Sequence, residues 1–152
     1  MRTCGTCTLC CKVLGVHELE KPGGVDCPHV KPLQGCGIYA DRPQSCRAFE
    51  CLWLQGEGRI PETLKPERTH VVLSATVDGE MIVAHVDADY PNADTLIRRG
   101  AMGRYIEALV KKGVVVFAVI GEERRMYYRG SKVPPHILER INTLKAKQED
   151  MQ

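Results

Sequence analysis

The sequence predicts an α+β protein that consists of an irregular cysteine-rich N-terminal lobe and a ββ-α-ββ-α unit. Two observations lead to this fold class. All eight cysteines of the 152-residue chain lie between residues 4 and 51, in a segment that is rich in Pro and Gly and poor in apolar residues. From residue 69 onward, apolar runs alternate with amphipathic stretches, which is typical of strands and helices that share a core. We therefore expect an antiparallel sheet covered by two helices.

The composition divides the chain into three segments. Residues 1–56 form the cysteine-rich lobe, and residues 57–68 read as a connector, because they contain Gly, Pro and charged residues without a clear periodicity. Residues 69–152 carry the regular strand and helix patterns. We expect this third segment to pack with the lobe as one compact unit.

The first two strands are predicted at 70–77 and 80–86, joined by an Asp-Gly turn at 78–79. Asp-Gly favours the tight turn of a hairpin, since both central residues of a type I′ turn need a positive φ. Extending the register outward from this turn places His70 opposite Asp87.

A helix is predicted over 93–112, where apolar residues recur on one face. Asn92 is a candidate N-cap and Gly113 a candidate residue for the C-terminal turn. Gly100 and Gly103 weaken the middle of this helix, so a break there is compatible with the pattern.

The last elements are a buried strand, its partner and a final helix. Residues 114–120 are continuously apolar, which indicates a strand covered on both faces. Residues 125–129 can return beside it after a turn at 121–124. Two prolines open a helix over 134–147, and four of its apolar residues are expected to face inward: Ile137, Leu138, Ile141 and Leu144.

Charge and hydropathy limit the partners of the chain. The net charge is +2, which argues against strong attraction to nucleic acid. No apolar stretch has the length of a signal peptide or of a membrane span. We therefore expect a cytoplasmic protein without a membrane partner, in a reducing compartment where structural disulfides are uncommon. The sequence does not determine whether the chain has a protein partner or which oligomeric state it adopts.

The cysteine spacing predicts metal ligands. In Cys4-x2-Cys7 and Cys7-x2-Cys10, a tight turn can direct two sulfur atoms at one ion. Cys10 and Cys11 are adjacent, so their side chains diverge, and this favours two metal positions or one cluster approached from two sides. All eight cysteines are candidate ligands: Cys4, Cys7, Cys10, Cys11, Cys27, Cys36, Cys46 and Cys51.

Eight thiols suffice for two sites of four cysteines each. One division groups Cys4, Cys7, Cys27 and Cys36 against Cys10, Cys11, Cys46 and Cys51, although interleaved sets fit the spacing equally well. Further candidate ligands are His17, Asp26 and His29, although a solvated loop histidine is the simpler interpretation of His29.

The spacing fits both zinc and iron. Closed all-thiolate sites are typical of structural zinc, and two Zn²⁺ ions would use every cysteine. Three cysteines at x2 spacing, followed by the distant Cys27-Pro28, are also similar to the ligand pattern of [4Fe–4S] proteins. An iron–sulfur oxidoreductase or electron-transfer protein is therefore the alternative.

A third interpretation is an interaction module, in which the lobe presents Trp53 and the loops near it to a partner protein. The competing interpretation is that Ile38, Tyr39, Phe49 and Trp53 pack the lobe against the sheet.

The cysteine pattern also resembles a known family. Three further features accompany it: Cys27-Pro28, the stretch Gly35-Cys36-Gly37-Ile38-Tyr39-x2-Arg42-Pro43, and then Cys46-Arg47-x-Phe49-x-Cys51. Together they resemble the CxxCxxCC cysteine-cluster family (YkgJ-like), known as a zinc- or iron-chelating domain. The resemblance covers residues 4–51 and implies metal chelation, with no implication for residues 68–152.

Two residue groups outside the cysteines merit attention. Arg42 and Arg47 flank the ligand candidates and could donate hydrogen bonds to thiolates.

Asp87, Asp89 and Asp94 could bind a cation, although a loop with a helix cap explains them more simply. No catalytic residue is predicted, and the familiar nucleotide-binding and hydrolase motifs are absent from the sequence.

Overall fold

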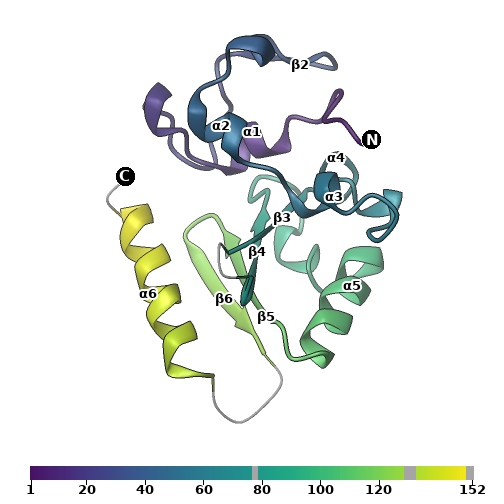
Figure 1. Ribbon diagram of the computed structural model, residues 1–152, viewed down its shortest axis with the longest axis vertical. Helices are drawn as coiled ribbons and strands as arrows, with labels where there is room; N and C mark the ends of the chain where they lie inside the picture. The colour runs from purple at the N-terminus through teal and green to yellow at the C-terminus, as the bar shows by residue number, and fades with distance from the viewer. Residues whose placement is uncertain (77–78, 129–132, 150–152) are drawn as a thin grey trace.

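The computed structural model describes residues 1–76, 79–128 and 133–149 and has the predicted α+β class. A lobe of short helices and loops sits on one end of a four-stranded sheet, and one long helix covers each face of that sheet (Figure 1). In the lobe, the elements are α1 (Leu9–Val13), η1 (His17–Leu19), β1 (Val30–Lys31), β2 (Gly35–Cys36), η2 (Tyr39–Asp41), α2 (Gln44–Ala48) and α3 (Leu52–Gln55).

The rest of the chain forms the sheet and its helices. Two short elements, η3 (Glu62–Leu64) and α4 (Pro66–Thr69), lead into it. They are followed by β3 (Val71–Ala75), β4 (Met81–Val86), η4 (Ala93–Thr95), α5 (Gly100–Lys111), β5 (Val115–Ile120), β6 (Glu123–Tyr127) and α6 (Pro135–Glu149).

The sheet is mixed, so the predicted all-antiparallel arrangement is wrong. The strand order is β3-β4-β5-β6, with β3/β4 and β5/β6 antiparallel and β4/β5 parallel. The reason lies in the connection between β4 and β5, which includes α5. A helical crossover of this length returns the chain to the same end of the sheet and yields a parallel neighbour.

The predicted hairpin register is confirmed. Val71 pairs with Val86, and the backbone N–H of Asp87 donates to the carbonyl of His70 at 3.0 Å. Residues 77 and 78 lie outside the described part of the chain, so the first half of the predicted turn does too. Gly79 has φ +72° and donates its N–H to the carbonyl of Thr76.

The helix after β4 is shorter than predicted. Gly100 has φ +64°, a left-handed conformation that interrupts an α-helix. The helix α5 accordingly begins at this residue. Asn92 lies at the predicted N-cap position, that of η4, but it has a left-handed φ of 55° and its side chain makes no capping hydrogen bond. Gly113 does have the positive φ expected after a helix C-terminus.

Two apolar clusters lie on opposite faces of the sheet. Strand β5 contributes to both, as expected for a strand without alternation. The cluster under α5 also contains Trp53 from α3, so the lobe end of the chain shares this core.

The cluster under α6 contains Ile137 and Ile141. Leu138 is 45% exposed, so its predicted inward position is wrong, while the side chain of Leu144 lies outside the described residues. Strand β6 begins at Glu123, two residues earlier than predicted.

Ion pairs attach the lobe to the sheet. Lys12 on α1 lies 3.0 Å from the carboxylate of Asp87 and 3.1 Å from that of Asp89. Asp94 instead pairs with Arg98 on its own segment, so the three aspartates form no common site and act as structural loop residues. No helix in the described part of the chain is long and apolar enough to cross a bilayer.

Candidate metal centre

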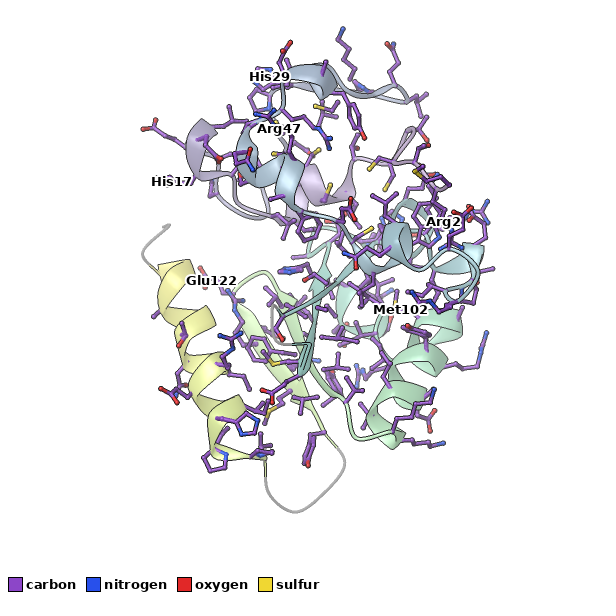
Figure 2. All side chains as sticks on the ribbon, in the orientation of Figure 1. Arg2, His17, His29, Arg47, Met102 and Glu122 are labelled. Atoms are coloured by element: carbon purple, nitrogen blue, oxygen red, sulfur yellow. The ribbon has the colours of Figure 1, made fainter. Side chains whose placement is uncertain are left out.

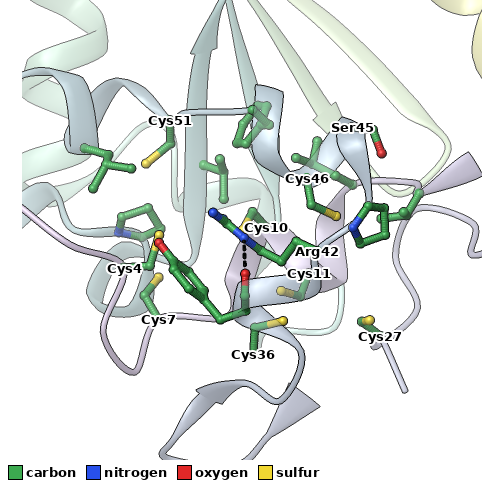
Figure 3. Close-up of a pocket in the computed structure, with 18 of the residues that line it drawn as sticks. Cys4, Cys7, Cys10, Cys11, Cys27, Cys36, Arg42, Ser45, Cys46 and Cys51 are labelled. Carbon is green, nitrogen blue, oxygen red and sulfur yellow. Dashed lines mark hydrogen bonds between the residues drawn. The ribbon is translucent and has the colours of Figure 1, made fainter. Parts of the chain in front are cut away.

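All eight cysteines line a single cavity of about 330 Å³ between the lobe and the sheet. They come from the loop before α1, α1 itself, the loop before β1, β2, α2 and the residue that precedes α3. The fold thus brings together every ligand candidate that the sequence names (Figure 3). Each thiol is free and partly accessible.

Local geometry explains the position of several thiols. Gly5, with φ +55°, allows a turn in which the N–H of Cys7 donates to the carbonyl of Cys4 at 2.9 Å. Gly35 has φ +99° and packs so closely on this turn that an added Cβ would lie 2.6 Å from the Gly5 oxygen. A side chain at Gly35 would therefore push the β1/β2 hairpin away from the first two cysteines.

Apolar side chains complete the cavity wall. They include Trp53 and Leu54 of α3, Val72 of β3 and Phe49. An apolar wall lowers the local dielectric constant, which strengthens the attraction between a thiolate and any nearby cation. Burial accordingly raises the pKa of the Cys4, Cys7 and Cys51 thiols, since it disfavours the charged form.

Cys10 and Cys11 behave as a pair. A hydrogen bond between their side chains raises the pKa of Cys10 and lowers that of Cys11. The positive charges of Lys21 and Arg42 lower the pKa of Cys11 further. Cys11 is thus the thiol whose anionic form the surroundings favour most among those with a resolved direction.

Arg42 lines the cavity, but the predicted hydrogen bond from it to a thiol is not found among the described residues. Its Nε–H donates to the carbonyl of Tyr39 at 3.0 Å, and its guanidinium stacks 3.8 Å from the Tyr39 ring centroid (Figure 3). Arg47 is exposed and does not line the cavity, so its predicted contact with the thiols is not present.

The spare ligand candidates also lie elsewhere. Neither His17, Asp26 nor His29 lines the cavity, and Figure 2 shows the two histidines at the outer side of the lobe. For His29, the interpretation as an ordinary loop residue is the better one.

Lys21 is the residue that the sequence did not reveal. It is only 5% exposed, and its ammonium group donates to the carbonyls of Lys12, Pro22 and Val25 at 3.2, 2.8 and 2.6 Å. Burial lowers the pKa of this ammonium group, and the negative charges of Cys27, Cys11, Asp26 and Cys46 oppose that shift. A lysine before Pro-Gly-Gly reads as a surface residue, so no sequence signal identifies it.

The cavity supplies suitable donors but no finished coordination sphere. Within residues 1–76, 79–128 and 133–149, no three His, Cys, Asp or Glu side chains are placed to hold one ion. Soft thiols around an apolar cavity, with two cations nearby, nevertheless match the donor chemistry that zinc and iron clusters require. The thiols would need to close on an ion.

Comparisons with known proteins identify no relative. No protein-family model matches the chain, and no match is found among curated proteins or solved structures. The resemblance of residues 4–51 to the CxxCxxCC cysteine-cluster family therefore stays a prediction.

Proposed function

We propose that this protein binds metal ions through its eight cysteines, with zinc as the native ion, and that the ions hold the N-terminal lobe in shape. The observation that carries the proposal is the convergence of all eight thiols on one cavity from segments between residues 4 and 51. Thiolates in closed sites of four ligands are typical of structural zinc.

The scarcity of apolar burial in the lobe supports a structural role. Within residues 1–50, all of which the structure describes, Leu9 and Val16 are the only buried hydrophobic residues. A segment of this length with so small a core needs disulfides or a metal to remain folded. Because all eight thiols are free, a metal is the element that fits.

Charge compensation also favours thiolate ligands. Four thiolates around one Zn²⁺ carry a net charge of about −2. Buried Lys21 and the inward-facing Arg42 supply positive charge next to the thiols and would offset part of it. Such neighbouring groups commonly tune the affinity of a metal site.

Metal analysis of protein purified without oxygen tests the proposal. We expect about two zinc ions per chain, released when a mercurial reagent blocks the thiols. A folded chain that carries no metal and has all its thiols available for modification would refute the proposal.

An iron–sulfur protein is the second candidate. Cys4, Cys7 and Cys10 keep the x2 spacing of [4Fe–4S] ligands, and Cys51 lies next to Cys4 and Cys7, where a fourth ligand would be needed. A cavity of about 330 Å³ is also large for a single ion. Iron together with sulfide in the same analysis, and a broad visible absorption band, would identify this case.

Replacing the buried lysine should weaken zinc binding. In Lys21→Gln, the cation beside Cys11, Cys27 and Cys46 is lost, and we expect zinc affinity to fall about 10- to 100-fold. Competition with a chromophoric chelator measures the change. Lys31→Gln is the matched control, because it removes the same charge from an exposed position in the same lobe. Equal affinities of the two variants would show that Lys21 has no influence on the site.

A further inference from the structure

We infer that the eight thiols form two separate sites: a first thiol set of Cys4, Cys7, Cys10 and Cys51, and a second thiol set of Cys11, Cys27, Cys36 and Cys46. The inference rests on the proposed function and specifies which cysteines share an ion. It differs from the division named in the sequence analysis, which places Cys10 and Cys11 in one site.

The first thiol set gathers around the turn before α1. The turn fixes Cys4 and Cys7 next to each other through their 2.9 Å backbone hydrogen bond. After burial, the charge of Cys51 is the next cause that raises the pKa of Cys4, ahead of that of Cys11, and Cys51 also raises the pKa of Cys7. Figure 3 places Cys4, Cys7 and Cys51 on the same side of the cavity. The charges of Cys4 and Cys7 also raise the pKa of Cys10, after its interaction with Cys11 and its burial.

The second thiol set gathers around the β1/β2 hairpin. Cys36 pairs with Val30 in this hairpin, and the N–H of Val30 donates to the carbonyl of Cys27 at 3.1 Å. The hairpin therefore holds Cys27 and Cys36 together. Cys46 on α2 is subject to the charges of three thiols, namely Cys11, Cys27 and Cys36.

The positive charge of Lys21 follows the same division. The thiols that act on its ammonium group are Cys27, Cys11 and Cys46, all from the second thiol set. The second site would thus have the buried Lys21 as its cation, while the charges of Arg42 and Lys65 act on Cys4 in the first thiol set.

Helix geometry separates the two adjacent cysteines. Consecutive residues of a helix point about 100° apart, since one turn takes about 3.6 residues. Cys10 and Cys11 lie on α1, so one can face the turn at Cys4–Cys7 while the other faces the hairpin. Each of these two thiols has the largest single effect on the pKa of the other, so the two sets meet at this point. Binding of an ion to each set would release the protons of both thiols to solvent and form metal–sulfur bonds in their place.

Zinc stoichiometry of paired Cys→Ser variants tests the division. Native mass spectrometry of zinc-loaded protein should find two ions in the wild type. Cys4→Ser/Cys51→Ser, which changes the first thiol set alone, should keep one ion. Cys4→Ser/Cys36→Ser, which changes one residue of each set, should keep none. The division with Cys4 and Cys36 in one site predicts the reverse pattern for these two variants.

The outcomes separate the division from the proposed function. Two ions in the wild type together with one ion in Cys4→Ser/Cys36→Ser would overturn the division but leave metal binding intact. A single ion or cluster per wild-type chain would do the same. A wild-type chain without any bound metal would overturn both.

Partial chelation of the wild type provides a test that does not depend on the folding of variants. Removal of one ion, followed by iodoacetamide and peptide mass spectrometry, should label the thiols of one set together while the other set stays protected. Joint labelling of Cys10 and Cys11 with protection of Cys4 and Cys7 would overturn the division.

Discussion

Chelation is expected to unfold the lobe and to leave the sheet folded. Residues 1–50 bury few apolar side chains, so the free energy of metal binding would supply most of their stability. For structural zinc in short peptides this amounts to about 10–16 kcal/mol. The sheet has its own apolar clusters on both faces, and of the eight cysteines Cys51 alone packs against one of them. Amide NMR spectra before and after a strong chelator measure the effect residue by residue.

The spectrum of the sheet provides the internal control. Amide signals of β4 and β5 should persist, and addition of zinc should restore those of the lobe. If metal analysis shows complete removal of the ions while the lobe signals stay in place, the structural role of the metal is wrong. The helix α3 is expected to remain ordered, because Trp53 belongs to the core under α5.

Trp53→Ala should be the most destabilising single substitution near the cavity. The side chain is 6% exposed and packs in the cluster with Ile60, Leu64 and Val71. Loss of so large a buried ring costs about 3–5 kcal/mol in other cores. Denaturant unfolding followed by circular dichroism measures the free energy of unfolding.

Two control variants define the cause of this loss. The buried indole N–H has no hydrogen-bond partner among the described residues, so Trp53→Phe removes volume but breaks no such bond. We expect its cost to be clearly smaller. Leu33→Ala, at a position that is 89% exposed, should change stability by no more than about 0.5 kcal/mol. A Trp53→Ala protein as stable as Leu33→Ala would contradict the assignment of Trp53 to the core.

Burial of Trp53 confirms that this residue packs the lobe against the sheet. The sequence allowed an interaction module that presents Trp53 to a partner protein, but the ring is not available at the surface. The Arg2 guanidinium lies 4.5 Å from its ring centroid and donates to the carbonyl of Trp53. The tryptophan therefore links the N-terminus and the lobe to the core.

Local patterns predicted the elements better than their arrangement. The hairpin register was predicted correctly, because the pairing of His70 with Asp87 follows by counting outward from the Asp-Gly dipeptide of the sequence. The direction of β5 relative to β4 could not be predicted in the same way. It depends on how the chain crosses the sheet after Asp87, and apolar runs do not record that path.

The candidate site shows the same difference. Cysteine spacing identified all eight cysteines that line the cavity, since metal ligands must come close in space. The burial of Lys21 depends on side-chain direction in an irregular segment, and the exposure of Arg47 depends on which face of α2 it occupies. Lys21 turns inward because three backbone carbonyls accept hydrogen bonds from its ammonium group. The residues next to it in the sequence do not predict this arrangement.

The short helix α1 connects the thiols to the sheet directly. Cys10 and Cys11 are followed at once by Lys12, whose ammonium group contacts the carboxylates of Asp87 and Asp89 after β4. Rotation of α1 during capture of an ion would therefore pull on the loop that leads toward α5. Metal binding at the cavity and the conformation of the loop after β4 would therefore be coupled.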